Sequence, residues 1–195
     1  MPEESALSQF ITAARTKDFQ RTERFRVVIT PPLISGIDPN QTKDLALMVE
    51  ECNIPGVIVQ NRPVKYNNRI QYQPTGIDYL GQEATFVFYL QSDWLQRNMI
   101  EMWINAVVDP QTRELAYKND IVGEIKVIPV KRDAIDANTG YCLHRVIPRT
   151  IAVMPMSQGT SGVARTTVTF SFDSWSSEQI DSNDESGSTR YGTTG

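Results

Sequence analysis

Residues 167–173, TVTFSFD, alternate strictly between polar and apolar side chains. Val168, Phe170 and Phe172 therefore share one face, and the hydroxyl and carboxyl side chains share the other. Successive side chains of a strand point to opposite faces, so this stretch predicts a strand with one buried face and one polar face. The same alternation recurs along the chain, and the sequence therefore predicts a mainly β protein.

The other strand predictions rest on the same periodicity. Residues 24–30 and 84–91 show it most clearly, with three large apolar side chains on one face of each stretch. Proline cannot donate a hydrogen bond to a neighbouring strand, so the stretches that contain proline are expected at sheet edges or bends. Weaker strand patterns lie at residues 45–51, 57–66, 69–73, 121–131 and 142–154.

One helix is strongly indicated after residue 92. Asp93 and Gln96 have the spacing of a capping box, and Asp109-Pro110 ends the pattern. We expect this helix to pack on a sheet, with its methionine and tryptophan side chains in the core. A shorter helix is predicted at residues 4–15, and loops are predicted at residues 31–43 and 108–118. The apolar positions of the main helix are Leu95, Met99, Met102, Trp103 and Ala106.

Composition and charge favour one domain with a polar tail. The chain has 195 residues and a formal net charge of −4, and no apolar run is long enough to span a membrane. Residues 176–195 hold four of the 23 acidic residues and one of the 19 basic residues, which leaves a body of charge −1. We expect residues 1–175 to form the domain, with residues 1–20 as an N-terminal arm, and residues 176–195 to be mobile. The N-terminal sequence lacks the pattern of a signal peptide, so we expect an intracellular origin.

The sequence offers little catalytic machinery. Cys142 and His144 are two residues apart, about 6.5 to 7 Å along a regular strand, whereas a thiol–imidazole dyad needs roughly 3 Å. Gly159-x-x-Gly162 precedes a predicted strand, whereas a phosphate-binding loop precedes a helix. We therefore expect no enzyme activity, no cofactor and no metal ion, and a Cys142/His144 thiol enzyme is the minor alternative.

A second alternative is a nucleic-acid-binding module. Basic and aromatic side chains alternate between Arg62 and Tyr72, a composition that also occurs at single-stranded nucleic-acid sites. The isoelectric point near 5.1 and the scattered carboxylates argue against this function. Contacts with another protein are the preferred interpretation of this ribbon.

The order of several short motifs carries a resemblance to a known family. The motifs are Asp18-Phe19 and Arg21, Phe25 to Ile29, Asn53-Ile54-Pro55-Gly56, Asn68-Arg69-Ile70, Thr85 to Tyr89, the helix with Asp93 and Trp103, and Val168 to Phe172 before Asp173-Ser174-Trp175. In this order, over roughly residues 15 to 175, the chain resembles the tail tube protein of contractile-tailed, T4-like phages. Residues 31–43 and the acidic tail look like additions to the family's compact body.

The resemblance implies a fold and a function. The expected fold is an antiparallel β-sandwich or half-barrel with one flanking helix, which forms a shared β-barrel when six copies assemble. Stacked hexameric rings would form the inner conduit for double-stranded DNA, in contact with tail sheath, baseplate and tail terminator proteins. The expected location is the virion tail, assembled in the host cytoplasm. A baseplate tube initiator or a tail terminator of related fold remains the alternative within the family.

The resemblance also points to contact residues. The ribbon over residues 57–74 resembles in position the family's projecting loop, which contacts neighbouring subunits. The expected contact residues are Arg62, Lys65, Tyr66, Asn67, Asn68, Arg69 and Tyr72. Strands near residues 45–51 and 121–131 are candidates for the channel wall, whose surface we expect to be neutral or acidic. The candidate lumen residues are Glu50, Gln60, Glu124 and Lys126.

Overall fold

The computed structural model describes most of the body of the chain. The described residues are 7–8, 11–12, 15, 19–33, 36–67, 69–79, 81–131, 139–159 and 162–179. Most of the helix predicted at residues 4–15 lies outside this set, as do Asn68 and the tail from residue 180 onward. Among the described residues, none of the helices is both long and apolar enough to cross a membrane.

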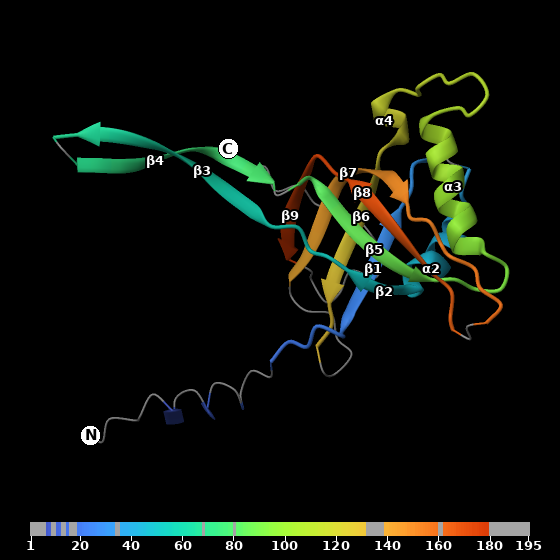
Figure 1. Cartoon of the computed structure of the whole chain (residues 1–195). Helices are drawn as coiled ribbons and strands as arrows, with labels where there is room; N and C mark the ends of the chain where they lie inside the picture. The colour runs from blue at the N-terminus through green and yellow to red at the C-terminus, as the bar shows by residue number, and fades with distance from the viewer. Residues whose placement is uncertain are drawn as a thin grey trace.

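Seven strands form one antiparallel sheet that curls around the core (Figure 1). Their order is β1-β6-β7-β8-β5-β2, and β9 pairs with the free edge of the first half of β7. The prediction of a mainly β, antiparallel half-barrel is therefore confirmed. The strands are β1 (Phe25–Thr30), β2 (Val49–Cys52), β5 (Glu83–Tyr89), β6 (Gly123–Pro129), β7 (Thr139–Ile151), β8 (Arg165–Ser171) and β9 (Ser174–Gln179).

The long strand β7 joins the two halves of this sheet. Its first half, up to His144, pairs with β6 and β9, and its second half, from Ile147, pairs with β8. Between them Arg145 has a φ of 56°, and the β6–β7 register shifts at the same place. Such a bulge bends a strand, so we call the two parts the β6 half-sheet (β1, β6, β9 and the first half of β7) and the β8 half-sheet.

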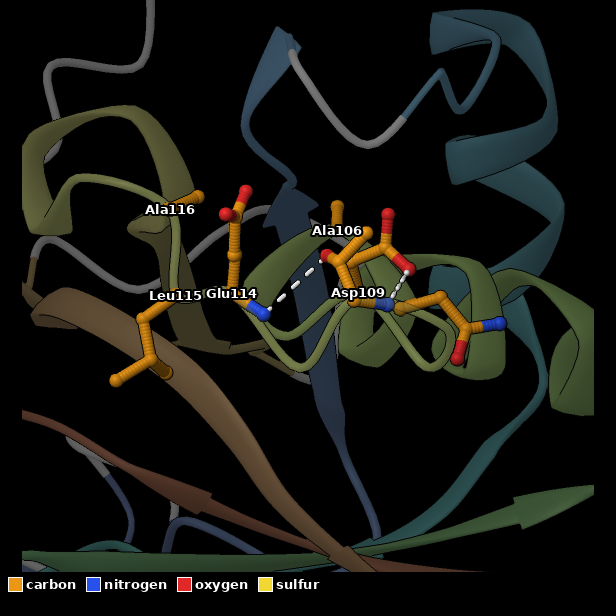
Figure 2. A pocket seen from close by; sticks show the side chains of 7 residues that line it. Ala106, Asp109, Glu114, Leu115 and Ala116 are labelled. Atoms are coloured by element: carbon orange, nitrogen blue, oxygen red, sulfur yellow. Dashed lines mark hydrogen bonds between the residues drawn. The ribbon is translucent and has the colours of Figure 1, made fainter.

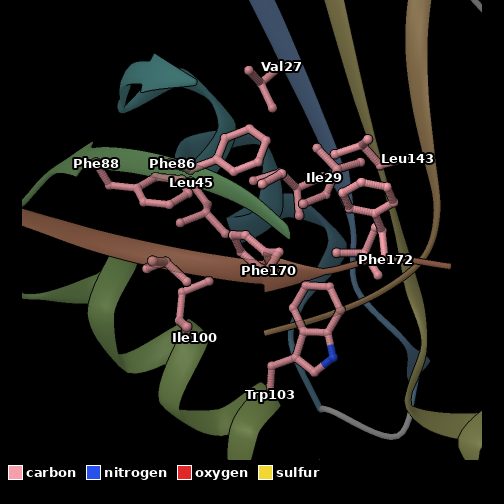
Figure 3. Packing of buried hydrophobic residues seen from close by; sticks show 14 of the residues in the cluster. Val27, Ile29, Leu45, Phe86, Phe88, Ile100, Trp103, Leu143, Phe170 and Phe172 are labelled. Carbon is pink, nitrogen blue, oxygen red and sulfur yellow. The ribbon is translucent and has the colours of Figure 1, made fainter. Parts of the chain in front are cut away.

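Helices α2 (Pro39–Leu47) and α3 (Leu95–Val107) contribute to the core from outside the sheet. Leu45 of α2 and Ile100 and Trp103 of α3 meet the aromatic side chains of β5 and β8 (Figure 3). The ring of Trp103 lies 5.9 Å from that of Phe170, and its Nε1 donates a 3.0 Å hydrogen bond to the carbonyl of Ile121, at the end of α4 (Lys118–Ile121). The main helix prediction is confirmed, and Met99 and Trp103 are buried as expected, but the prediction of Met102 as a core residue is wrong, because its side chain is 43% exposed.

The capping box predicted for α3 is wrong. The helix begins at Leu95, and its N-cap residue is Trp94, which has a φ of 58° and whose side chain makes no capping hydrogen bond. Asp93 Oδ1 accepts a 3.2 Å hydrogen bond from the N–H of Leu95, so only the Asp93 side of the predicted box has a role at the helix start. The Gln96 side chain is buried and turns back to Gln91, accepting a hydrogen bond from its backbone N–H and donating one to its side-chain oxygen. The buried amide is thus satisfied by the chain that enters the helix.

Three predicted boundaries also change. Residues 39–43, predicted as loop, and 45–47, predicted as strand, belong to α2, and the neighbouring strand runs from 49 to 52. Proline at the first position of α2 is a helix-start signal, and Leu45 then turns toward the core, where it is 1% exposed. Strand β9 continues to Gln179, so the first four residues assigned to the tail are paired with β7.

Strands β3 (Val57–Tyr66) and β4 (Arg69–Tyr79) form a separate two-stranded sheet. This hairpin projects far from the body and is surrounded by solvent on both faces (Figure 1). Strand β4 is longer than the predicted stretch 69–73, because it continues through Pro74 with a register shift opposite Gln60 and Asn61. A proline at a bulge is compatible with a strand.

Candidate functional site

The two faces of the β3–β4 hairpin differ in character. Residues directly opposite each other in an antiparallel pair share a face, so the register assigns each side chain of the hairpin to one of its two faces. One face is mainly apolar, and we call it the apolar hairpin face: Val57, Val59, Asn61, Pro63, Lys65, Ile70, Tyr72, Pro74, Ile77 and Tyr79. The opposite, mainly polar face is called the polar hairpin face: Ile58, Gln60, Arg62, Val64, Tyr66, Arg69, Gln71, Gln73 and Asp78.

The apolar hairpin face is open to solvent in the single chain. Ile70, Tyr72 and Ile77 are 64%, 71% and 68% exposed. A two-stranded hairpin is marginally stable alone in water, and contiguous exposed apolar side chains mark interaction surfaces. The apolar hairpin face is therefore a candidate interaction surface.

The base of the hairpin is anchored to the body. Tyr79 packs edge-on against Trp175 of β9, with ring centroids 6.3 Å apart, and Tyr141 of β7 lies on the same indole at 5.8 Å. At the register shift, Thr75 Oγ1 donates a 3.1 Å hydrogen bond to the carbonyl of Gln60. The Tyr79–Trp175 contact thus joins the hairpin to the body, and the Thr75 hydrogen bond joins its two strands.

The structure brings the expected contact residues together in the outer half of the hairpin, but on different faces. Arg62, Tyr66 and Arg69 lie on the polar hairpin face, whereas Lys65 and Tyr72 lie on the apolar hairpin face. Asn67 occupies the turn with a φ of 43°, and Asn68 lies outside the described residues. Sequence reasoning missed Val59 and Ile77 near the base of the hairpin, because Pro74 and Gly76 interrupt the alternation that would have revealed the second strand.

Three of the candidate lumen residues, Glu50, Glu124 and Lys126, lie on the face of the sheet turned away from the core, and Gln60 lies on the hairpin. Glu124 and Lys126 share the outer face of the β6 half-sheet, where Lys126 pairs with Glu178 at 3.2 Å. Glu50 lies on β2, at the other end of the strand order, and pairs with Arg165, which holds the pKa of the Glu50 carboxyl below its ordinary value. Gln60 belongs to the hairpin and donates to Asp78.

The side chains of Cys142 and His144 turn toward each other on the same face of β7. The Cys142 Sγ is 3.7 Å from His144 Nδ1 and donates to Glu124 Oε1 at 2.8 Å. Burial, together with the Glu124 carboxylate, raises the pKa of the Cys142 thiol far above its ordinary value. A buried, protonated thiol is a poor nucleophile, so this contact gives no support to the thiol-enzyme alternative.

A hollow at the C-terminal end of α3 lies beside a turn that Asp109 closes. It has a volume of about 320 Å³ and lies between α3 and the following turn (Figure 2). Asp109 Oδ1 accepts hydrogen bonds from the N–H groups of Gln111 and Thr112, and these bonds hold the pKa of Asp109 below its ordinary value. The Asp109 carboxylate is therefore engaged in closing the turn. The hollow is lined by Asn105, Ala106, Asp109, Thr112, Glu114, Leu115 and Ala116.

Comparison with protein families gives a match over most of the chain. The model of a family described as phage tail tube protein matches residues 20–178. No curated protein sequence matches the chain significantly. The matched region begins before β1 and ends one residue before the end of β9, so it contains the sheet up to residue 178, the hairpin and both longer helices.

Solved structures share the fold at low sequence identity. A chain of the PVC sheath–tube complex, from an extracellular contractile injection system in its extended state, matches with a TM-score of 0.60 and 9% identity, covering 87% of this chain and 97% of that one. A chain of the anti-feeding prophage tube-terminating cap matches with a TM-score of 0.60 and 10% identity, covering 84% and 93%. A chain of the anti-feeding prophage baseplate matches with a TM-score of 0.59 and 9% identity, covering 84% and 97%.

Proposed function

Because the chain belongs to the phage tail tube protein family, we propose that it is the repeated structural subunit of a contractile tail tube. Six copies form a ring, and stacked rings form the conduit through which double-stranded DNA leaves the virion. The observation that carries this proposal is the apolar hairpin face, which the single chain leaves in water. The subunit is assembled in the host cytoplasm and resides in the virion tail.

A neighbouring copy is the occupant that suits this surface. The body carries a formal charge of only −1 without residues 176–195, so identical subunits repel each other weakly. Closing strands across subunits removes the free sheet edges that invite uncontrolled pairing. The hairpin therefore supplies the apolar area that assembly needs.

The proposed partners at the two ends and the outside of the tube are baseplate, terminator and sheath proteins. Chains of the same fold occur in structures of a sheath–tube complex, a baseplate and a tube-terminating cap. A baseplate tube initiator or a tail terminator has the same fold and remains the alternative. Copy number on the virion separates them, because a tube subunit is present in many rings and an initiator or terminator in one.

The test is assembly of the full chain, followed by size-exclusion chromatography with light scattering and negative-stain electron microscopy. We expect sixfold rings or tubes from the wild type and monomers from Tyr72→Asp, which places a charge on the apolar hairpin face. The matched control is Gln73→Asp, the next residue on the same strand but on the polar hairpin face. Equal assembly of both variants, or a wild type that stays monomeric at high concentration, would overturn the proposal.

The polar hairpin face also separates the tube from the nucleic-acid alternative. Arg62 and Arg69 lie on this face with Tyr66 near the turn, an arrangement that could contact phosphates. For a tube subunit we expect no mobility shift of DNA by the unassembled chain at physiological salt. A shift that weakens steeply with salt, and that disappears when both arginines are replaced by alanine, would favour the binding module.

A further inference from the structure

Three potential metal ligands converge on the outer face of the β6 half-sheet. Glu124 extends from β6, and Cys142 and His144 extend from the adjacent strand β7. Their ligand atoms all lie within 4.8 Å of one another. The separations are 2.8 Å for Sγ to Oε1, 3.7 Å for Sγ to Nδ1 and 3.3 Å for Nδ1 to Oε1.

These separations are close to the edges of a zinc tetrahedron. Zinc bonds of about 2.3 Å to sulfur and about 2.0 to 2.2 Å to nitrogen and oxygen imply ligand–ligand edges of about 3.4 to 3.6 Å. The Sγ–Nδ1 and Nδ1–Oε1 separations of 3.7 and 3.3 Å already match. The shorter Sγ–Oε1 contact is the thiol hydrogen bond, which must open by about 0.8 Å when a metal takes the place of the proton.

The imidazole is oriented as a metal ligand requires. His144 Nε2 lies 2.7 Å from the hydroxyl of Ser176 on β9, while Nδ1 faces the thiol and the carboxylate. Metal-binding histidines commonly use their second ring nitrogen in such a hydrogen bond, which fixes the ring and its tautomer. A catalytic triad differs, because there the acid and the nucleophile contact opposite nitrogens of the ring.

Charge and access are also compatible with a metal ion. Lys126 neighbours the cluster, but its ammonium group is paired with Glu178 at 3.2 Å. Cys142 is buried, whereas the side chains of His144 and Glu124 are 34% and 39% exposed, which leaves an approach from solvent. A divalent ion with one carboxylate and one thiolate forms a neutral unit, and the thiol proton is released to solvent.

We propose that Glu124, Cys142 and His144 bind one zinc ion, with water in the fourth position. A thiolate and an imidazole favour zinc over magnesium or calcium, which prefer oxygen ligands alone. The ion would link β6 to β7 beside the bulge at Arg145, and Ser176 would hold the imidazole from β9. The proposal does not depend on the tube function, because the cluster lies within one chain.

The experiment is a titration of the full-length, chelator-treated protein with Co²⁺ and then Zn²⁺. We expect one Co²⁺ per chain with the near-ultraviolet absorption of a thiolate–cobalt bond, displaced by Zn²⁺, and a higher melting temperature with Zn²⁺. His144→Asn and Cys142→Ser should lose the band, and Ser176→Ala should weaken binding by about tenfold to a hundredfold. Cys52→Ser, which removes the other cysteine, should leave it unchanged.

Two outcomes would overturn the proposal. One is the absence of a thiolate–cobalt band from the wild-type protein at millimolar Co²⁺. The other is a band that persists unchanged in His144→Asn. Circular dichroism of each variant confirms folding before the titration, and assembly assays on the same samples show separately whether rings form.

Discussion

Gly123, at the start of β6, makes room for the ring of Trp103. A Cβ atom at this position would lie 2.5 Å from the carbonyl oxygen of Thr30 and 2.6 Å from two ring atoms of Trp103. Both obstacles are rigid, because one is backbone and the other is a fully buried indole. The indole is held in turn by its hydrogen bond to Ile121, so the site has little freedom to relax.

We therefore expect Gly123→Ala to lower the free energy of unfolding by about 1 to 3 kcal/mol, as overpacked core substitutions do. Urea unfolding followed by tryptophan fluorescence measures this loss. Gly76→Ala is the control, because a Cβ there meets nothing within 4 Å. A Gly123→Ala protein as stable as the control would show that the core near Trp103 is looser than the contacts indicate.

Asp173 is the residue whose charge most clearly supports the fold. Its carboxylate accepts hydrogen bonds from Lys118 Nζ and Arg145 Nε, both at 2.8 Å. These bonds lower the pKa of the Asp173 carboxyl, and the bond from Lys118 has the larger effect. A lowered pKa in the folded state adds stability above the unfolded pKa of about 3.9, and this stability is lost as the pH falls through the folded value.

The expected result for Asp173→Asn is a lower melting temperature than the wild type at pH 7 and a smaller difference near pH 2.5. The loss at pH 7 should stay within about 1 kcal/mol, because the ion pairs are partly exposed. Thermal unfolding across this pH range tests the expectation, with Glu114→Gln on an exposed turn as the control. A difference that is constant with pH would contradict the role of the charge.

At the scale of elements, the sequence pattern predicts every described strand except β9, although the bounds of several strands shift. Strands β1, β5 and β8 each bury a full apolar face, which the period-two pattern reveals directly. Helix α2 was missed because its apolar stripe is short and its start signal, Pro39, was interpreted as part of a loop. The hydrophobic pattern alone does not encode such local starts.

The cluster at Cys142 shows a second limit of sequence reasoning. A regular strand separates the backbones of residues i and i+2 by about 6.5 to 7 Å, and β7 pairs with β9 without a register shift from Cys142 to His144. The side-chain atoms nevertheless approach to 3.7 Å, and the sequence does not show how the side chains of this strand and of Glu124 on β6 turn toward one another. The contact of the thiol with His144 and Glu124 therefore appears only when the strands are placed in space.

The hairpin should be dispensable for folding of the body. Of its described residues, only Tyr79 packs against the core. We expect a variant in which Asn-Gly joins Ile58 directly to Asp78, its cross-strand partner, to melt within a few degrees of the wild type and to remain monomeric. Calorimetry and light scattering measure these two properties, and rings formed by this variant would show that the hairpin is not the assembly element.

At the scale of the whole molecule, the exposed apolar side chains and the weak net charge of the body predict how assembly responds to salt. Sodium chloride hardly weakens the stabilisation that comes from buried apolar side chains. Contacts between exposed charges, in contrast, weaken as the Debye length falls from about 10 Å at 0.1 M to about 3 Å at 1 M. We expect rings to persist across this range of sodium chloride and to be favoured by sulfate. Dissociation at 1 M, measured by light scattering, would indicate an interface held by charges.

The hairpin leaves the body in one direction only (Figure 1). When identical copies join through such a projection, the surface that gives and the surface that receives are different, so the contact is heterologous and each added layer repeats the same orientation. A tube built in this way is polar, because all its subunits have the same orientation along the axis. Its two ends are chemically different, and the proteins that start and stop its growth must therefore recognise different surfaces.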